Sequence, residues 1–529
     1  MANIMVIAES GPIAQACLNR LSKRTTVDTC QLAPRLDHGY APFLLEHDVD
    51  TLVYIPQRRR RNDMTPDLVE AETVLAACTA AQISRLVVVS SAAIYGAGPH
   101  NPGFMDELRH PMHRDKNTIG DQWTQLETLV EKSMGQQPGV KLTILRPVAV
   151  PTRNEADYFS RIFRAGWVAT IPMFDPAIQV LSPDDLAQAI GSAVEHGSGG
   201  VFNVAPDGVI PLRQALGMTG ARRMPTGLLL QRMVRWGLAA LGLTFPADQL
   251  EYIRYAWTVS NEKIKRELGF APEQSSVGAL RALLNGDANA PWQSHAKEEP
   301  TFDDFGKDLA YIESKRRWVF KFFYDYYWRI EVEGGEHIPR QGRAVIVGMH
   351  RGFMPFDGVM AFEAVAREVQ RYMRFLIHPC LIKRPIPFNF NKLACLKVSR
   401  ENADYVLQHD ELLGFYPEGI EGAFRRYRNV YQLGKFGRNE FVKFALRNQA
   451  PIVPFVTVGS AEIFPVVGKN QVAMVEGANP MAMFPDCAPL SLVATALSHK
   501  VAHAVFRTDA YRARLPARGR QRPGSGAGD

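Results

Sequence analysis

Long apolar runs are missing from this 529-residue sequence. No stretch reaches the roughly 18 uncharged apolar residues that a membrane-spanning helix requires. The first ten residues, MANIMVIAES, also lack the basic region and the long apolar core of a secretory signal. We therefore expect a cytoplasmic protein that does not span a membrane.

Cysteines are few and follow no paired spacing. Zinc sites and disulfide frameworks need cysteines, or cysteines with histidines, at short regular intervals. The lack of such spacing argues against a zinc site and against a disulfide framework. It also favours a reducing compartment and a protein that requires no metal. The six cysteines are Cys17, Cys30, Cys78, Cys380, Cys395 and Cys487.

Acidic residues are outnumbered by basic ones, 54 to 61, which gives a formal net charge of +7. This balance favours an anionic partner, and composition alone does not distinguish phospholipid from nucleic acid. With 46% hydrophobic residues, the chain is long enough for roughly two to four domains with sizeable cores. Two large domains are the simplest interpretation.

Short apolar runs alternate with helix-like segments through the first 285 residues. This alternation predicts a doubly wound parallel sheet with helices on both faces. The expected strands are Ile4–Ala8, Thr51–Ile55, Leu86–Ser90 and Leu142–Leu145, and two expected helices are Asp67–Ala81 and Trp123–Met134.

Five further motifs make this half of the chain specific. They are VVVSSAAIYG (87–96), LTILRP (142–147), VLSPDDLAQAI (180–190), GVFNVAPDG (200–208) and NEKIKRELGFAP (261–272). In this order they resemble the extended short-chain dehydrogenase/reductases, the NAD-dependent epimerase/dehydratase family. The resemblance implies a Rossmann-like domain over residues 1–285, in which Gly11 and Ser91 occupy positions of the NAD(P) site.

The phosphate-binding loop departs from the family pattern. That pattern has three glycines, which permit a tight turn and the close approach of the pyrophosphate. The matching positions here are Ala8, Gly11 and Ala14. In addition, Glu9 places a carboxylate where the anion would lie, at the N-terminus of a helix.

The residues that transfer hydride in this family are also missing. Where the family has a Tyr and, four residues later, a Lys, counting back from Glu127 gives Ile119 and Trp123. No Tyr occurs between Tyr95 and Tyr158. We therefore predict a domain that has lost its redox chemistry; the alternative is an NAD(P)-dependent oxidoreductase or epimerase of nucleotide sugars or sterol-like alcohols.

A polar and charged segment, residues 286–304, predicts a linker to a second domain at 305–469. The tail at 470–529 matches no motif. Reading it with an offset of one nucleotide turns the dipeptides Met474–Val475 and Met481–Ala482 into Trp codons. Our hypothesis is a frameshift from about residue 470; the alternative is a divergent, partly disordered tail.

A His and an Asp share one strand-to-helix turn, RAVIVGMHRGFMPFDG (343–358). The apolar run Ala344–Gly348 predicts a strand, and an apolar-periodic helix begins near Asp357. A general base needs an imidazole and a carboxylate that fixes its tautomer. His350 and Asp357 are therefore candidate catalytic residues; the alternative is a surface His beside an Asp that starts a helix.

Two further blocks follow this turn, GFYPEG (414–419) and APIVPFVTVG (450–459). In this order the three blocks resemble the glycerolipid acyltransferases, the family of 1-acylglycerol-3-phosphate acyltransferases. The resemblance implies an α/β domain that moves an acyl chain from acyl-CoA or acyl carrier protein to a hydroxyl of a (lyso)phospholipid or related glycerolipid. It also implies a bacterial enzyme of phospholipid biosynthesis, peripheral on the inner face of the cytoplasmic membrane. No cofactor for acyl transfer and no nucleic acid partner are expected.

The resemblance makes His350 the base that takes the acceptor proton and Asp357 the residue that orients it. Six residues separate the two, where four are common, and Met349 replaces the Asn that usually precedes the His. Position 355, where the common spacing would place the Asp, is Pro355.

The resemblance also implies where the acceptor binds. Arg400 matches a basic residue that holds the acceptor phosphate, and Glu418 and Gly419 match the acceptor-binding turn. Arg425 and Arg428 follow, and guanidinium groups suit a phosphomonoester because they donate in a bidentate fork. A membrane-facing basic patch is the alternative.

Three segments are candidates for contact with a membrane or an anion. Ile312–Ile330 has eight aromatic and five basic residues in nineteen positions, which suits the headgroup zone of a bilayer; a core-packed helix is the alternative. Thr226–Pro246 is either an interfacial helix or a helix of the substrate-capping subdomain. Arg58–Arg61 is either an anion contact or a solvated loop. A non-catalytic lipid or nucleotide sensor remains an alternative for the whole chain.

Overall fold

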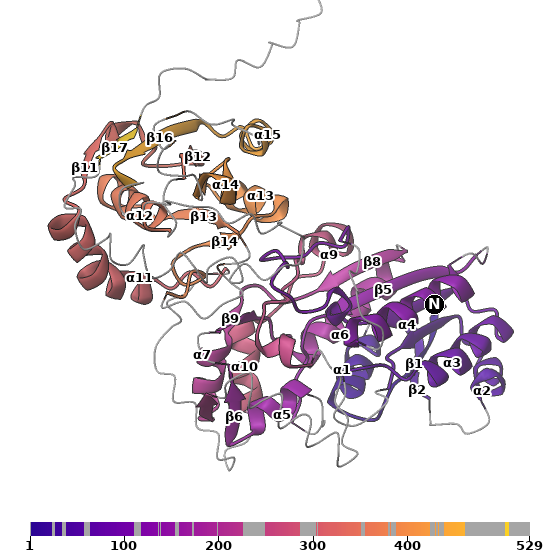
Figure 1. Ribbon diagram of the computed structural model, residues 1–529. Helices are drawn as coiled ribbons and strands as arrows, with labels where there is room; N and C mark the ends of the chain where they lie inside the picture. Colours follow the sequence, from indigo (N-terminus) through magenta and orange to yellow (C-terminus); the bar gives the residue numbers. More distant parts are fainter. Residues whose placement is uncertain are drawn as a thin grey trace, which may run out of the picture. The chain divides into compact units, whose positions relative to one another are not determined.

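The computed structural model divides into two compact units (Figure 1). The first comprises Met1–Ser314 and Ile377–Asn402, and the second comprises Lys315–Leu376 and Ala403–Asp529. Residues 2–460 and 503–506 are described, with gaps at 24–26, 34–38, 58–63, 110–117, 136, 138, 154–157, 172–173, 198, 226–248, 286–302, 304, 351–354, 379–380, 382–387, 424–428, 430–431 and 433–438.

A six-stranded parallel sheet forms the centre of the first unit, in the order β2-β1-β3-β4-β5-β8. After β1 the chain adds β2 on one side and then returns to place β3 on the other, which creates the switch point of a doubly wound sheet. The predicted fold is therefore confirmed for this unit. The strands are β1 (Ala2–Ile7), β2 (Val27–Leu32), β3 (Thr51–Tyr54), β4 (Arg85–Val89), β5 (Lys141–Pro147) and β8 (Gly200–Val204).

Helices alternate with these strands. Helix α1 packs against α6, and α3 packs against α2 and α4. The central strands are buried along nearly their whole length, which explains why β3 and β4 read as continuous apolar runs. The helices are α1 (Pro12–Leu21), α2 (Ala41–Glu46), α3 (Leu68–Ala80), α4 (Ile119–Met134) and α6 (Pro183–His196).

Smaller elements complete the first unit. There are two short two-stranded sheets. In one, β6 (Trp167–Thr170) pairs with β10 (Arg222–Pro225), and in the other, β7 (Ala177–Ile178) pairs with β9 (Ile210–Pro211). The helices here are α5 (Tyr158–Arg164), α7 (Leu212–Met218), α9 (Glu262–Leu268), α10 (Ser276–Asn285) and α11 (Leu309–Lys315), with 3-10 turns at Ala92–Tyr95 and Gln249–Ile253. Strand β14 (Leu396–Lys397) belongs to the segment Ile377–Asn402.

The second unit is built on a sheet with the order β11-β17-β16-β12-β15-β13. Strand β12 is parallel to both of its neighbours, and β17 runs antiparallel to β16. This mixed α/β architecture confirms the predicted fold class. The strands are β11 (Glu331–Glu333), β12 (Ala344–Val347), β13 (Met373–Ile377), β15 (Leu412–Phe415), β16 (Ile452–Val458) and β17 (His503–Phe506).

Strand β17 lies in the tail, where we predicted no strand. It pairs with β16 and β11, so these four residues are part of the sheet. The rest of 470–529 lies outside the described residues, as do Arg58–Arg61, Thr226–Pro246 and nearly all of the linker 286–304.

Helices of the second unit include α12 (Phe356–Val369), α14 (Gly419–Ala423) and α15 (Glu440–Arg447). Helix α13 (Arg400–Gln408) begins in the segment that groups with the first unit. Ahead of β11, two π-helical turns cover Arg316–Phe320 and Phe322–Tyr327. Within the described parts of both units, no helix combines the length and the apolar character needed to cross a bilayer.

Candidate active site

His350 and Asp357 lie on the turn that joins β12 to α12. The Nδ1 atom of His350 is 2.6 Å from Oδ2 of Asp357, the Asp357 side chain is fully buried, and the His350 side chain is 18% exposed. The unusual six-residue spacing therefore does not prevent the pair from meeting. An imidazole that reaches solvent beside a buried carboxylate has the geometry of a general base with its orienting group.

Helix α12 holds the carboxylate in place. Asp357 is its second residue, and its Oδ1 accepts a hydrogen bond of 2.8 Å from the Gly358 backbone N–H. The N-terminus of a helix also favours a negative charge, because its first backbone N–H groups point toward that end. Both oxygens of this buried carboxylate thus have a donor, which reduces the cost of keeping it in the interior.

Tyr416 forms a second support for His350, and we did not predict this role. Its ring is stacked on the imidazole at a centroid distance of 4.9 Å. The Phe375 ring is stacked on the Tyr416 ring as well, at a centroid distance of 5.2 Å. Burial raises the pKa of the Tyr416 phenol well above its ordinary value, and the negative Asp357 raises it further. The phenol oxygen is buried without a hydrogen-bond partner among the described residues. The aromatic position of the YPEG motif was the only sequence signal for this residue.

Helix α14, which begins at the last residue of the YPEG motif, approaches the His350 backbone at Gly422. A methyl group on Gly422 would lie 2.8 Å from Glu418 Oε2 and 2.9 Å from the His350 carbonyl oxygen. Gly419 has φ of +55°, in the left-handed region that glycine tolerates best. The two sequence blocks meet because β12 and β15 are adjacent and parallel, so both turns leave the same edge of the sheet.

The phosphate-binding role of Arg400, Arg425 and Arg428 stays a prediction. Arg400 begins α13 and groups with the first unit, whereas His350 belongs to the second. Arg425 and Arg428 fall among residues that the structure does not describe. In the second unit the described cluster therefore consists of His350, Asp357, Tyr416 and the turn at Glu418–Gly419.

The predicted cofactor positions of the first unit follow strands β1 and β4. Gly11 is the N-cap of α1 in extended conformation, and Ser91 Oγ accepts a 3.1 Å hydrogen bond from the Ala93 N–H. Ile119 is fully buried at the start of α4. The Trp123 indole N–H donates to the Met64 carbonyl at 2.7 Å. Neither Ile119 nor Trp123 has an ionisable group that could serve a nicotinamide site.

Two family models match separate stretches of the chain. Residues 329–458 match the family model Acyltransferase, and residues 58–205 match the NAD dependent epimerase/dehydratase family. The chain contains an acyltransferase domain and an epimerase-like domain.

Relatives of known sequence are largely uncharacterized. An uncharacterized protein of Mycobacterium tuberculosis is 35% identical over 194 residues, which cover 36% of this chain and 51% of that protein. One of Mycobacterium leprae is 35% identical over 215 residues, or 40% and 55% of the two chains. Phytyl ester synthase 2 of Arabidopsis thaliana is 28% identical over 140 residues, or 25% and 20%. The chain thus spans about half the length of the mycobacterial relatives.

Solved structures similar to the chain include epimerases. UDP-N-acetylglucosamine 4-epimerase from Bacillus cereus is 15% identical, covers 54% of this chain and 98% of its own, and gives a TM-score of 0.40. UDP-glucuronic acid 4-epimerase from Bacillus cereus in complex with NAD is 15% identical, covers 53% and 96%, and also gives 0.40.

A buried polar network connects the strands of the epimerase-like domain. Arg146 on β5 donates to both carboxylate oxygens of Glu127 on α4, at 2.9 and 2.6 Å, and to the Tyr95 hydroxyl at 2.8 Å. Burial raises the pKa of the Tyr95 phenol to about 12, so it stays protonated and donates to Asn203 Oδ1 at 2.8 Å. Ser90 also donates to Glu127, at 2.6 Å. We did not predict this network, although Arg146 is part of the LTILRP motif.

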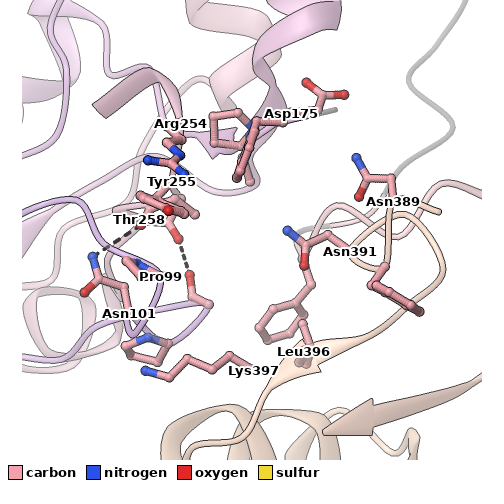
Figure 2. Close-up of a pocket in the computed structure, with 18 of the residues that line it drawn as sticks. Pro99, Asn101, Asp175, Arg254, Tyr255, Thr258, Asn389, Asn391, Leu396 and Lys397 are labelled. Atoms are coloured by element: carbon pink, nitrogen blue, oxygen red, sulfur yellow. Dashed lines mark hydrogen bonds between the residues drawn. The ribbon is translucent and has the colours of Figure 1, made fainter. Parts of the chain in front are cut away.

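The first unit also contains a pocket that none of the predicted site residues lines (Figure 2). The Arg254 guanidinium lies 4.8 Å from the ring centroids of both Phe174 and Tyr255. Its Nε has no hydrogen-bond partner in the described structure. Asn402 fixes the segment Ile377–Asn402 beside the pocket, because its Oδ1 accepts from the Gly103 N–H at 2.7 Å. Other lining residues are Pro99, Asn101, Asp175, Thr258, Asn389, Asn391, Leu396 and Lys397.

Proposed function

We propose that the acyltransferase domain moves an acyl chain from a thioester donor to a hydroxyl group of a lysophospholipid or related glycerolipid. The observation that carries the proposal is the 2.6 Å contact between His350 and Asp357 on the turn after β12. A match to the acyltransferase family over residues 329–458 supports the reaction class. The lipid acceptor and the thioester donor, acyl-CoA or acyl carrier protein, are our inference.

His350 acts as the general base in this reaction. Its Nδ1 faces the Asp357 carboxylate, so Nε2 is the atom that takes the proton from the acceptor hydroxyl. The acceptor oxygen then bonds to the thioester carbonyl carbon, and the carbon–sulfur bond breaks. The thiolate that leaves takes the proton back from Nε2, which restores the neutral imidazole.

Asp357 and Tyr416 keep the imidazole ready for this step. The carboxylate fixes the tautomer and stabilises the imidazolium while the proton resides on His350. The stacked Tyr416 ring restricts rotation of the imidazole about its bond to Cβ. The turn at Glu418 and Gly419 is proposed to contact the acceptor, since it leads into helix α14, whose Gly422 lies close to both the Glu418 side chain and the His350 carbonyl.

The proposal is tested by incubating the full chain with labelled acyl-CoA or acyl-carrier protein and a panel of acceptors. The panel contains lysophosphatidic acid, lysophosphatidylglycerol, glycerol 3-phosphate and phytol, the last because one relative is named a phytyl ester synthase. Labelled product that depends on a lysophospholipid is the expected result. If only phytol gave a labelled product, the acceptor would be a long-chain alcohol rather than a lysophospholipid. Donor hydrolysis without any acylated product would contradict acyl transfer to a lipid.

Asp357→Asn is expected to lower kcat by about tenfold or more, but by less than loss of the imidazole. The amide keeps a hydrogen-bonding group beside His350, yet it carries no charge to stabilise the imidazolium. The effect should appear in kcat rather than in KM for the acceptor, because the carboxylate is buried and contacts the base. Asp410→Asn is the matched control, since it removes an exposed carboxylate that pairs with Arg343 in the same unit. An Asp357→Asn enzyme with the kcat of the control would contradict this role.

We further propose that the epimerase-like domain transfers no hydride. Hydride transfer in this fold needs a phenol to move the substrate proton and an amine to lower its pKa. Ile119 and Trp123 occupy those positions and pack in the interior. At the phosphate loop, the exposed Glu9 would repel a pyrophosphate. An NAD(P)-dependent epimerase or oxidoreductase is therefore the less favoured candidate.

Titration of the full chain with NAD and NADP is expected to give weak binding and no change in cofactor absorbance over a panel of sugar nucleotides and sterol-like alcohols. Glu9→Gly should increase the affinity for both cofactors, because it removes the carboxylate from the loop after β1. It should still give no turnover, since the residues at 119 and 123 are unchanged. Turnover by the parent chain on any of these substrates would refute this proposal.

A further inference from the structure

The residues of the segment Arg316–Arg329 fall into four rows along the helix. Each row consists of residues that are four positions apart in the sequence. The segment consists largely of two π-helical turns, in which hydrogen bonds close over five residues rather than four. A π-turn therefore takes more residues than an α-turn, and residues four apart come close to one line along the helix. The rows differ sharply in chemistry and exposure.

One row faces the interior and the row two positions away faces solvent. Phe320, Tyr324 and Trp328 are buried. On the other side, Trp318, Phe322 and Tyr326 are 75%, 51% and 66% exposed. Single exposed apolar residues are ordinary, but three large aromatic side chains in one exposed row indicate a contact surface. We call Trp318, Phe322 and Tyr326 the aromatic row.

Basic residues flank the aromatic row on one side. Three exposed basic residues belong to this flank. Arg317 and Lys321 directly precede Trp318 and Phe322, and Arg329 lies three residues after Tyr326. The Lys321 ammonium lies 5.8 Å from the Tyr326 ring centroid and pairs with Asp325 at 2.8 Å. The solvent side of the segment thus combines aromatic rings with positive charge.

Ion pairs fix the segment against α12, so the aromatic row cannot turn inward. Arg316 binds Glu363 at 2.7 Å, and Arg367 binds both Glu363, at 2.8 Å, and Asp325, at 2.6 Å. Glu363 is buried, which makes its pairs with Arg316 and Arg367 specific anchors rather than surface contacts. The Arg367 guanidinium also lies 4.1 Å from the Tyr324 ring centroid on the buried side.

The segment also contacts the turn that carries the catalytic pair. Phe356, the residue before Asp357, lies 5.6 Å from the Phe323 ring and 5.3 Å from the Trp328 ring. The aromatic row is therefore presented by a body that packs directly on the start of α12. A surface that meets this row would lie beside the unit's active site.

We propose that the aromatic row, with Arg317, Lys321 and Arg329, docks the acyltransferase domain on an anionic phospholipid bilayer. Aromatic side chains with polar tips favour the headgroup zone, where rings and water are both accessible. Lys and Arg beside them add attraction to anionic headgroups. The inference extends the proposed function, because an acylated glycerolipid resides in a bilayer. Docking would bring that acceptor to His350 by diffusion in two dimensions.

The test is flotation of the full chain with vesicles of phosphatidylcholine alone and of phosphatidylcholine with phosphatidylglycerol. The parent is expected to bind the mixed vesicles, and the triple variant Trp318→Ala, Phe322→Ala, Tyr326→Ala to bind at least about tenfold less. Arg317→Gln with Lys321→Gln should lose the preference for anionic vesicles and the sensitivity to salt. Trp167→Ala is the matched control, because it removes an exposed tryptophan from β6 in the other unit.

A lipid-quenching measurement covers the case of a poorly folded triple variant. Trp318→Phe should still bind the mixed vesicles but should lose the quenching of tryptophan fluorescence by brominated lipid. Equal binding by parent and triple variant would overturn the proposal, as would unchanged quenching in Trp318→Phe. Failure of the parent to bind, together with self-association that Trp318→Ala abolishes, would instead identify a protein interface.

These results separate docking from catalysis. His350→Ala should bind vesicles like the parent, because the base is not part of the docking surface. Vesicle binding without acyl transfer would refute the proposed function and leave docking intact. Acyl transfer to a detergent-solubilised acceptor without vesicle binding would refute docking alone.

Discussion

His350→Ala is expected to lower acyl transfer by at least about 10²-fold, the usual contribution of a general base. The reason is local: Nδ1 contacts the buried Asp357 at 2.6 Å, and the ring is the group of this pair that reaches solvent. Without it the proposed reaction loses the group that takes the acceptor proton. The measurement is kcat/KM with labelled donor and the preferred lysophospholipid.

Two further variants make this loss interpretable. Alanine leaves the Asp357 carboxylate buried without the imidazole, which can destabilise the domain by itself. His350→Gln can donate an amide hydrogen bond to Asp357 but cannot accept a proton at neutral pH, so it should lose the same activity with less effect on unfolding. His409→Ala is the matched control, since His409 is exposed on the same unit. Full activity in His350→Gln would contradict general base catalysis by this residue.

The pair could be predicted because its signal is local. A strand, a short turn and a helix place His350 and Asp357 within one connection, and the structure differs from the expected strand ends by only one or two residues in this region. The same holds for the first sheet, where Thr51–Tyr54 and Arg85–Val89 closely match the expected strands. Continuous apolar runs mark strands that are buried on both faces.

Features that depend on distant contacts could not be predicted. Tyr416 stacks on His350 only because β15 lies next to β12, and no property of either segment alone reveals that pairing. For Ile312–Ile330, the interpretation as a core-packed helix holds for one row of the π-helical turns, which is buried, but another row is exposed; contact with a membrane stays a prediction. A helical wheel drawn with 3.6 residues per turn mixes these rows, because π-turns take more residues.

The Glu127–Arg146 pair is a structural element of the epimerase-like domain. Both side chains are buried, and their hydrogen bonds join α4, β5, the end of β4 and the turn at Tyr95. Removal of one member of such a pair typically costs about 3–5 kcal/mol, because the other charge stays buried and unpaired.

Arg146→Met is therefore expected to destabilise the epimerase-like domain by about 3–5 kcal/mol. Because the chain has two units, one unfolding midpoint would mix their stabilities, so hydrogen exchange resolved by segment is the suitable measurement. Protection should fall along β4 and β5 and stay unchanged along β12 and β16. Adding Glu127→Leu should restore most of the protection, because it removes the orphaned carboxylate and leaves apolar side chains of similar size. Arg266→Met, which breaks an exposed pair with Glu267, is the control and should change little. If the double variant were no better protected than Arg146→Met, the cost would come from lost packing around Arg146 rather than from a buried charge without its partner.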